Sequence, residues 1–369
     1  MYISTHIQLI QGTTIIIVCT GVFSFVAFIF LITILFSRVL KNNRARRFDK
    51  LQEEFQKTLN ALIILEHSKE NLSFSLDYHL KNLMQKIRTS FGKQLLIDQI
   101  MSNKVNLKGS SAIILRTVYI RLGLKKLSIS KLNYRPQLKV VQALHELAEM
   151  ECVDSISAIQ KLLHHRQLVI RRECFITLVR LSGSFASVAS YKGMITPWMQ
   201  LTIYRHLSML PSDRLPKFHT WFRSPNRDIR KLAITMAHHF RQTEAVPGLS
   251  QLLYDDDLEI AGLAITCLGD MGAVEYSNAI AGVGRNNPFD ESISSKVIRA
   301  LGQIGNGEHH AAFLAWHMVH SSDTLRLQAM TAMQALNLNC RDFLIDFNAQ
   351  NDNAFESLFA HVTEPLLQS

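Results

Sequence analysis

The feature that most constrains this chain is an internal repeat in its second half. Residues 154–163 (DSISAIQKLL) match residues 244–253 (EAVPGLSQLL) without a gap, and their apolar positions coincide. A shorter period appears further on, because residues 264–272 (AITCLGDMG) match residues 297–305 (VIRALGQIG) at an offset of 33. Units of roughly 30 to 45 residues with two helices each are typical of an α-solenoid. Each pair leaves an apolar stripe that only the next pair covers, so the sequence predicts a stack of helix pairs.

Five segments of this region recur with similar apolar spacing, and three of them carry an aliphatic–Arg pair near their start. They are residues 169–181, 228–240, 258–272, 293–305 and 325–336. The pattern resembles the first helix of HEAT and HEAT-like (armadillo-type) repeats, over about residues 135 to 340. Arg171, Arg230 and Arg326 match the family's Arg position, whereas Ala261 and Ser294 depart from it. As a whole the chain resembles membrane-anchored HEAT-repeat proteins of bacteria, and this resemblance implies an adaptor.

The amino-terminal part is uncharged from Ile7 to Ser37. Residues 15–36 as a helix would extend about 33 Å at 1.5 Å per residue, enough to cross a bilayer. A cleaved signal peptide would need a basic stretch and a small-residue cleavage site, and neither is present. We therefore expect a transmembrane helix over 13–37, after a short non-cytoplasmic tail over 1–12. Basic residues crowd its carboxyl side, which predicts a single-pass protein of the cytoplasmic (inner) membrane with its solenoid in the cytoplasm.

The rest of the chain is expected to be helical, so the fold class is all-α. Residues 38–70 read as a basic juxtamembrane segment and amphipathic stalk, with Phe55, Leu59 and Leu62 on one apolar stripe that allows a homodimer. Residues 71–135 read as a basic helical start of the solenoid, 136–350 as HEAT-like repeats, and 351–369 as a C-terminal capping helix. Gly272 and Gly305 are the last residues of two of the repeated segments, where a left-handed helix end is expected.

Charge is divided unevenly along the chain. Residues 1–243 hold 35 Lys or Arg against 14 Asp or Glu, whereas residues 244–369 hold 5 against 16. One interpretation is a basic zone that binds anionic inner-leaflet lipids or an anionic partner; the other is ordinary solvated helix faces. The candidate residues are Arg38, Lys41, Arg44, Arg46, Arg47, Lys81, Lys86, Arg88, Lys93, Arg121, Lys125 and Lys126.

Aromatic residues cluster in residues 196–225, which depart from the repeat pattern. Trp198, Phe218, Trp221 and Phe222 either line a groove for a partner helix or fill the gap in an irregular unit. The sequence leaves both interpretations open.

Catalytic motifs are missing from the sequence. There is no phosphate-binding glycine loop, nucleophile elbow or H-E-x-x-H pair, and the His145-Glu146 pair lacks a second histidine. We therefore expect no cofactor and no metal. The preferred hypothesis is a membrane-tethered scaffold for protein partners, supporting a complex such as one for envelope-polysaccharide synthesis. The alternatives are an enzyme of lyase or hydroxylase type with a site in the concave face, and a nucleic-acid-binding solenoid.

Overall fold

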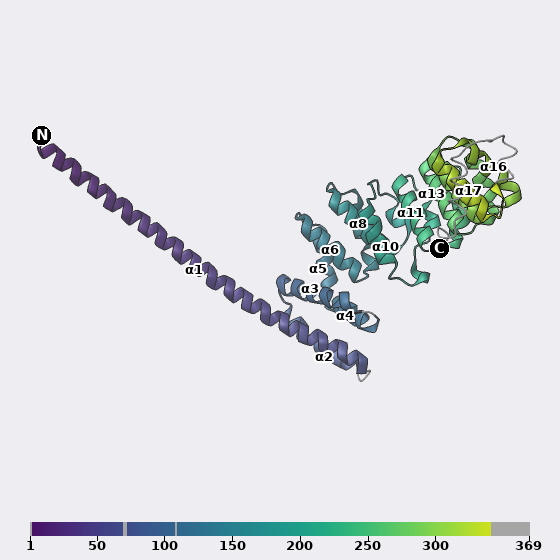
Figure 1. The fold of residues 1–369 in the computed structure, drawn as a ribbon. Coiled ribbons are helices and arrows are strands. Elements are labelled where there is room, and N and C mark those ends of the chain that lie inside the picture. Colours follow the sequence, from purple (N-terminus) through teal and green to yellow (C-terminus); the bar gives the residue numbers. More distant parts are fainter. Residues whose placement is uncertain (1, 69–71, 108, 341–369) are drawn as a thin grey trace. The chain divides into compact units, whose positions relative to one another are not determined.

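The computed structural model describes residues 2–68, 72–107 and 109–340, and every element in these ranges is a helix (Figure 1). The chain divides into two compact units, Met1–Asn133 and Tyr134–Ser369. The second unit begins two residues before the position at which the repeats were expected to start.

The first unit is built on one long helix. Helix α1 (Tyr2–Ser68) packs through its second half against α2 (Leu72–Lys86), α3 (Ser90–Asn106) and α4 (Ser110–Arg121), and α5 (Leu124–Lys131) contacts α3 and α4. Phe55, Leu59 and Leu62 of α1 are fully buried in this core. Their stripe, which the sequence offered for a homodimer through the stalk, is therefore covered by helices of the same chain.

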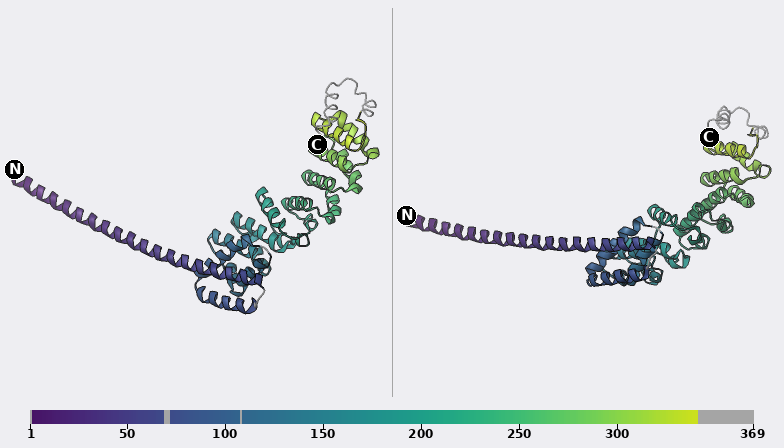
Figure 2. Two further views of the ribbon diagram at one scale, coloured as in Figure 1. Left: turned by 60° about the horizontal axis from the view of Figure 1, so that its bottom comes forward. Right: turned by 90° about the horizontal axis from the view of Figure 1, so that it is seen from below.

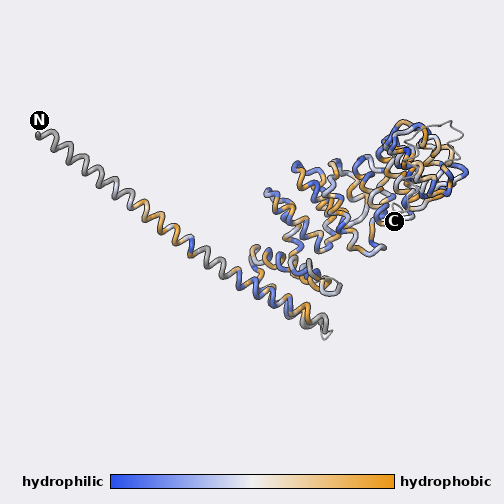
Figure 3. Tube along the Cα trace, in the orientation of Figure 1, coloured by the Kyte–Doolittle hydropathy of each residue, from blue (hydrophilic) through white to orange (hydrophobic). Residues whose placement is uncertain are grey.

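The first half of α1 corrects a prediction from the sequence. Within the ranges given above, no helix combines the length and the apolar composition that crossing a membrane requires. Figure 3 shows a hydrophobic stretch in the first half of α1. For the part of the chain that the structure describes, the transmembrane helix over 13–37 and the single-pass inner-membrane localisation are therefore wrong.

The second unit is a stack of helix pairs, which Figures 1 and 2 show following one another along the chain. Between residues 137 and 335 the main elements are, in chain order, α6 (Gln137–Glu149), α7 (Ile156–Gln160), η2 (Lys161–His164), α8 (Leu168–Ser182), α9 (Phe185–Val188), α10 (Pro197–Leu207), η4 (Phe218–Trp221), α11 (Arg227–His239), α12 (Val246–Leu252), α13 (Leu258–Asp270), α14 (Ser277–Asn286), α15 (Glu291–Ile304), α16 (Gly307–His320) and α17 (Asp323–Ala335). The contacts pair an element with the helix that follows it: η2 with α8, η4 with α11, α12 with α13, α14 with α15, and α16 with α17. A solenoid of helical repeats, as the sequence predicts, is therefore the fold of the described part of this unit. The expected capping helix over 351–369 and the last ten residues of the expected repeat range lie outside the described residues.

First helices stack on first helices from α6 to α10 and again from α11 to α17. Contacts join α6 to α8, α8 to α10, α11 to α13, α13 to α15, and α15 to α17. The second helices sit on this row, as α12 does on α13 and α14 on α15 and α16. Ile159 and Leu249, which the 90-residue repeat aligned, are both fully buried, so the repeat in sequence is a repeat in packing.

First helices end in a recurrent left-handed turn. The residue that adopts positive φ is Glu151, Arg241, Gly272 or Asn337, depending on the unit. At α13 the N–H of Ala273 then donates to the carbonyl of Leu268 at 3.1 Å, which satisfies one of the last helical carbonyls. Gly305 differs from the expectation, because its backbone is extended at φ −70°. A Cβ there would lie 2.3 Å from the Leu301 carbonyl oxygen, so close approach and not handedness favours glycine at this position.

Candidate functional site

The loop before α10 is fixed by contacts with α8, by contacts with the start of α11 and by a hydrogen bond within the loop. Tyr191 is buried against the ring of Phe175 on α8, with ring centroids 4.6 Å apart, and its hydroxyl donates to the Met194 carbonyl at 3.2 Å. Asn226 at the start of α11 donates from its amide to the carbonyls of Tyr191 and Gly193 at 3.0 and 3.1 Å. The loop is therefore pinned between the helices on either side of it, although it has no regular structure.

Helix α10 begins directly after this loop. Thr196 accepts a hydrogen bond from the Met199 N–H at 3.4 Å as the N-cap, and Pro197 follows at the first helical position, where its missing N–H has no cost. These residues place Trp198 in the first turn with 76% of its side chain exposed. Trp198, Leu201 and Arg205 follow at spacings of three and four residues, so they lie on one face of α10.

Exposed apolar residues also lie at the start of α8 and in the segments that flank α10. Helix α8, which contacts α10, begins with Leu168 and Val169. Both are exposed in the first turn of α8, and Trp198 is exposed in the first turn of α10. Met194 of the pinned loop is 73% exposed, and Met209 directly after α10 is exposed as well. We call this set the apolar platform; its members are Leu168, Val169, Met194, Trp198, Leu201 and Met209.

The platform lies in the most one-sidedly basic part of the solenoid. Residues 161–223 hold ten Lys or Arg against two acidic residues, Glu173 and Asp213. Arg166, Lys192 and Arg205 are exposed close in sequence to platform residues. An apolar surface with a basic margin is therefore presented on a rigid support.

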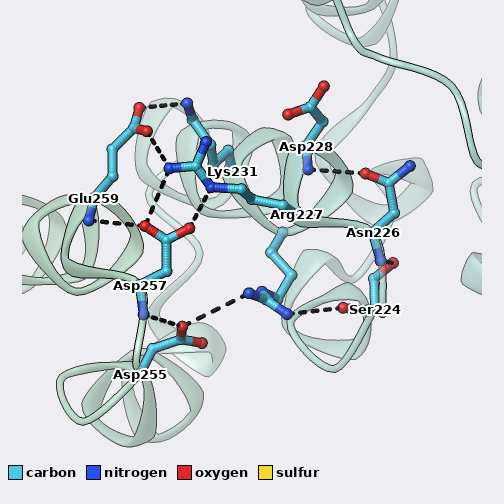
Figure 4. Close-up of polar contacts among 9 residues, drawn as sticks. Ser224, Asn226, Arg227, Asp228, Lys231, Asp255, Asp257 and Glu259 are labelled. Atoms are coloured by element: carbon cyan, nitrogen blue, oxygen red, sulfur yellow. Dashed lines mark hydrogen bonds and ion pairs between the residues drawn. The ribbon is translucent and has the colours of Figure 1, made fainter.

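The following repeats carry a different surface at the starts of their first helices, where charges pair across the stack (Figure 4). Arg227 of α11 bonds to Asp257 and, at 2.6 Å, to Glu259 at the start of α13, and Lys231 bonds to Glu259. The hydrogen bond from Arg227 lowers the pKa of the Asp257 carboxyl to about 2, and the bond from Lys231 lowers the pKa of Glu259. Arg230 lies 3.6 Å from Asp255 in the turn before α13. These charges neutralise one another and hold neighbouring repeats in register.

Such pairs recur along the first-helix row, and we call them the charge ladder. Arg180 of α8 lies 2.5 Å from Glu149 of α6. Further on, Asp270 of α13 accepts from Gln303 of α15 at 2.9 Å and lies 3.0 Å from His238 of α11. A pocket of about 410 Å³ opens beside Asp270, lined also by Arg241 and Gly272. Its one carboxylate is already engaged by His238 and Gln303, so the pocket is part of the ladder.

The aromatic residues that the sequence singled out are separated by the structure. Phe218 and Trp221 are fully buried, and Phe222 is buried as well. Phe218 stacks on Phe240 of α11 with ring centroids 6.3 Å apart, which ties η4 to that helix. These three residues fill the irregular unit, whereas Trp198 alone of the four is exposed.

The basic residues that the sequence singled out are spread over the first unit. Lys81, Arg88 and Lys126 are exposed, while Lys93 and Lys125 are partly buried. Lys86 pairs with Glu54 at 3.0 Å, and Arg121 pairs with Asp77 at 2.8 Å. Arg38 is exposed on α1, and the side chains of the remaining candidates, Lys41, Arg44, Arg46 and Arg47, lie outside those that the structure describes.

The potential metal ligands and the His145-Glu146 pair can be located in the described part of the chain. No group of three or more His, Cys, Asp or Glu residues is placed there to hold a metal ion. His145 is exposed on α6 while Glu146 is buried, so the two side chains point in different directions.

Comparison with known proteins does not name a family. No family model and no curated protein matches the chain. Among solved structures, the chain is similar to two engineered proteins. The first has 13% sequence identity over 85% of this chain and 98% of that chain, with a TM-score of 0.32. The second has 14% identity over 61% of this chain and 96% of that chain, with a TM-score of 0.24.

Proposed function

We propose that the helical repeats are of the HEAT type and that the chain is a scaffold that binds a protein partner through the apolar platform. The membrane tether of the sequence hypothesis is not part of this proposal. The single strongest support for the proposal is the 76% exposure of Trp198 in the first turn of α10. Hydrogen bonds of Tyr191 and Thr196 fix the loop before this turn and the start of the helix.

The HEAT assignment is supported by the role of the arginine that the family pattern places early in the first helix. Arg171 donates from Nη1 to the His165 carbonyl at 2.8 Å, six residues earlier, in the turn that precedes α8. Arg230 makes the equivalent bond to the Ser224 carbonyl at 3.3 Å, again six residues earlier. The same side chain thus fastens the same turn in two repeats, which explains why the pattern asks for Arg there.

The scaffold assignment is supported by the cost of exposing the platform. Burial of apolar surface contributes about 25 cal/mol of favourable free energy for each Å² removed from water. Large apolar side chains that stay exposed do not gain this free energy. Contiguous exposed apolar groups on rigid elements are typical of interaction sites, and Trp is among the residues that dominate interface energies. Elsewhere on the first-helix face, the charged groups of the ladder are already paired with neighbouring repeats. The platform is therefore the better candidate for docking a partner.

The proposal is tested by placing a photo-crosslinking amino acid at Leu201 in the full chain, expressed in its native cells. Tyr254, whose exposed ring lies in the turn before α13, is the matched control position. A discrete protein adduct from position 201 that does not form from position 254 is the expected result. No protein adduct at 201, or an adduct with nucleic acid only, would overturn the scaffold proposal.

A further inference from the structure

We infer that the partner segment on the apolar platform is an acidic amphipathic helix. The inference rests on the proposed function and names the chemistry of the occupant. It is drawn from the length of the platform, the residue types in it and the charge around it.

The length of the platform fits a helical occupant. Trp198, Leu201 and Met209 follow one face of α10 and the turn after it, over about 16 Å at 1.5 Å per residue. A partner helix presents apolar residues at i, i+4, i+7 and i+11 over the same distance, as helices that lie in apolar grooves do. Met194 is exposed in the loop before α10, and Leu168 is exposed at the start of α8, which contacts α10, so a partner helix can meet more apolar surface than the α10 face alone.

The residue types of the platform favour a partner with aliphatic side chains over a nucleic acid with stacked bases. Two of the six platform residues are methionines, whose flexible and polarizable side chains adapt to apolar partners of different shape. Single-stranded nucleic acid is bound on successive aromatic rings, and Trp198 is the one aromatic member of the platform. The basic margin is shared by both kinds of binding, but the apolar surface fits a peptide.

The charge around the platform selects an acidic partner. Only two acidic residues accompany ten basic ones over residues 161–223. Arg205 lies on the platform face of α10 one turn after Leu201, and Arg166 and Lys192 are exposed close in sequence to Leu168 and Met194. Asp or Glu residues on the flanks of the partner helix would meet these cations, which accelerates association and lowers affinity as salt rises.

The test uses the full chain and three synthetic 18-residue peptides labelled with fluorescein. The first carries Leu at i, i+4, i+7 and i+11 with Glu on its other faces. The second replaces each Glu by Lys, and the third keeps the Glu residues but scatters the Leu residues around the helix. Fluorescence anisotropy gives the dissociation constants. Acrylamide quenching reports burial of Trp198 when it is measured in a Trp316→Phe chain, because Trp316 is partly exposed and Trp221 is fully buried.

We expect the first peptide to bind at least tenfold more tightly than either control and to protect Trp198 from acrylamide. Trp198→Ala should weaken this binding about thirtyfold, the usual loss for a central Trp. Because Trp198 is exposed, its replacement should leave the melting temperature unchanged, and Tyr254→Ala should leave the binding unchanged.

Two results would overturn the inference. Equal or tighter binding of the Lys peptide would refute the acidic partner, and tighter binding of a single-stranded oligonucleotide that is lost in Trp198→Ala would assign the platform to nucleic acid. A protein adduct at position 201 with no preference for the acidic peptide would leave the scaffold function standing and refute only the chemistry of its partner. Failure of both experiments would refute both proposals.

Discussion

Helix α16 carries a histidine that should make the end of the solenoid sensitive to acid. His317 is fully buried, with its Nδ1 2.8 Å from the Ser321 hydroxyl and its ring against those of Phe313 and Trp316. Its Nε2 is buried and finds no hydrogen-bond partner in the described part of the chain. Burial lowers the pKa of His317 to about 4, because the surroundings cannot solvate the charged ring.

The sign and size of the effect follow from this shift. The unfolded chain binds a proton near pH 6.5 and the folded chain only near pH 4, so the contribution is complete above pH 6.5 and is lost as pH falls. At 1.36 kcal/mol per pKa unit, the loss is about 2 kcal/mol between pH 7 and pH 5 and about 3 kcal/mol in full. The range from pH 7 to pH 5 lies above the titration of ordinary carboxyl groups, so they contribute little to it.

Hydrogen exchange measured by mass spectrometry can follow this loss in α16 itself. After correction for intrinsic exchange rates, the opening free energy of residues 307–320 should fall by about 2 kcal/mol from pH 7 to pH 5. His317→Gln should reduce this dependence, whatever it costs in stability at pH 7. The part that remains is assigned to His310 of the same helix, whose pKa burial also lowers. His320→Gln, an exposed position on the same helix, should leave the dependence intact. An unchanged slope in His317→Gln would refute the reasoning.

Three further predictions concern the support of the platform and the ladder. Gly193→Ala would place a Cβ 2.5 Å from the Tyr191 hydroxyl and should destabilise the chain by about 2 kcal/mol, whereas Gly282→Ala, which meets nothing within 4 Å inside α14, should be neutral or stabilising in thermal unfolding. Trp221→Ala empties a fully buried site and should cost about 3 to 5 kcal/mol in urea unfolding; a cost below 1 kcal/mol would contradict the burial. Arg180→Ala and Glu149→Ala should each cost about 1 to 2 kcal/mol, and in a double-mutant cycle their effects should not add, because the pair is mostly buried.

The regular repeats could be predicted because burial leaves a periodic record in sequence. Ile159 and Leu249 align at 90 residues and are both fully buried, since each occupies the same place in a helix pair. Gly272 was also expected in a left-handed turn and adopts φ 73°. Gly305 was expected to do the same and does not, because a glycine also serves where a backbone comes close, and one sequence cannot tell the two needs apart.

The platform and the ladder could not be predicted in the same way. Trp198 and Trp221 lie in one irregular unit without periodicity, so nothing in the sequence says which is exposed and which is buried. Arg227 and Asp257 are 30 residues apart, and their pairing depends on the stacking of α11 on α13. The apolar run of α1 shows the opposite error, in which composition alone predicted a membrane span that the described residues do not support.

The ladder also has a mechanical consequence. Its bonds join residues 25 to 33 positions apart, from Glu149 and Arg180 to Asp270 and Gln303, and each one ties a repeat only to its neighbour. Small rotations at successive joints add up without breaking any one of them, so the described array should flex as a spring. Under tension it should lengthen as helix pairs unfold one at a time. When the tension is released, the pairs should refold one after another on their neighbours.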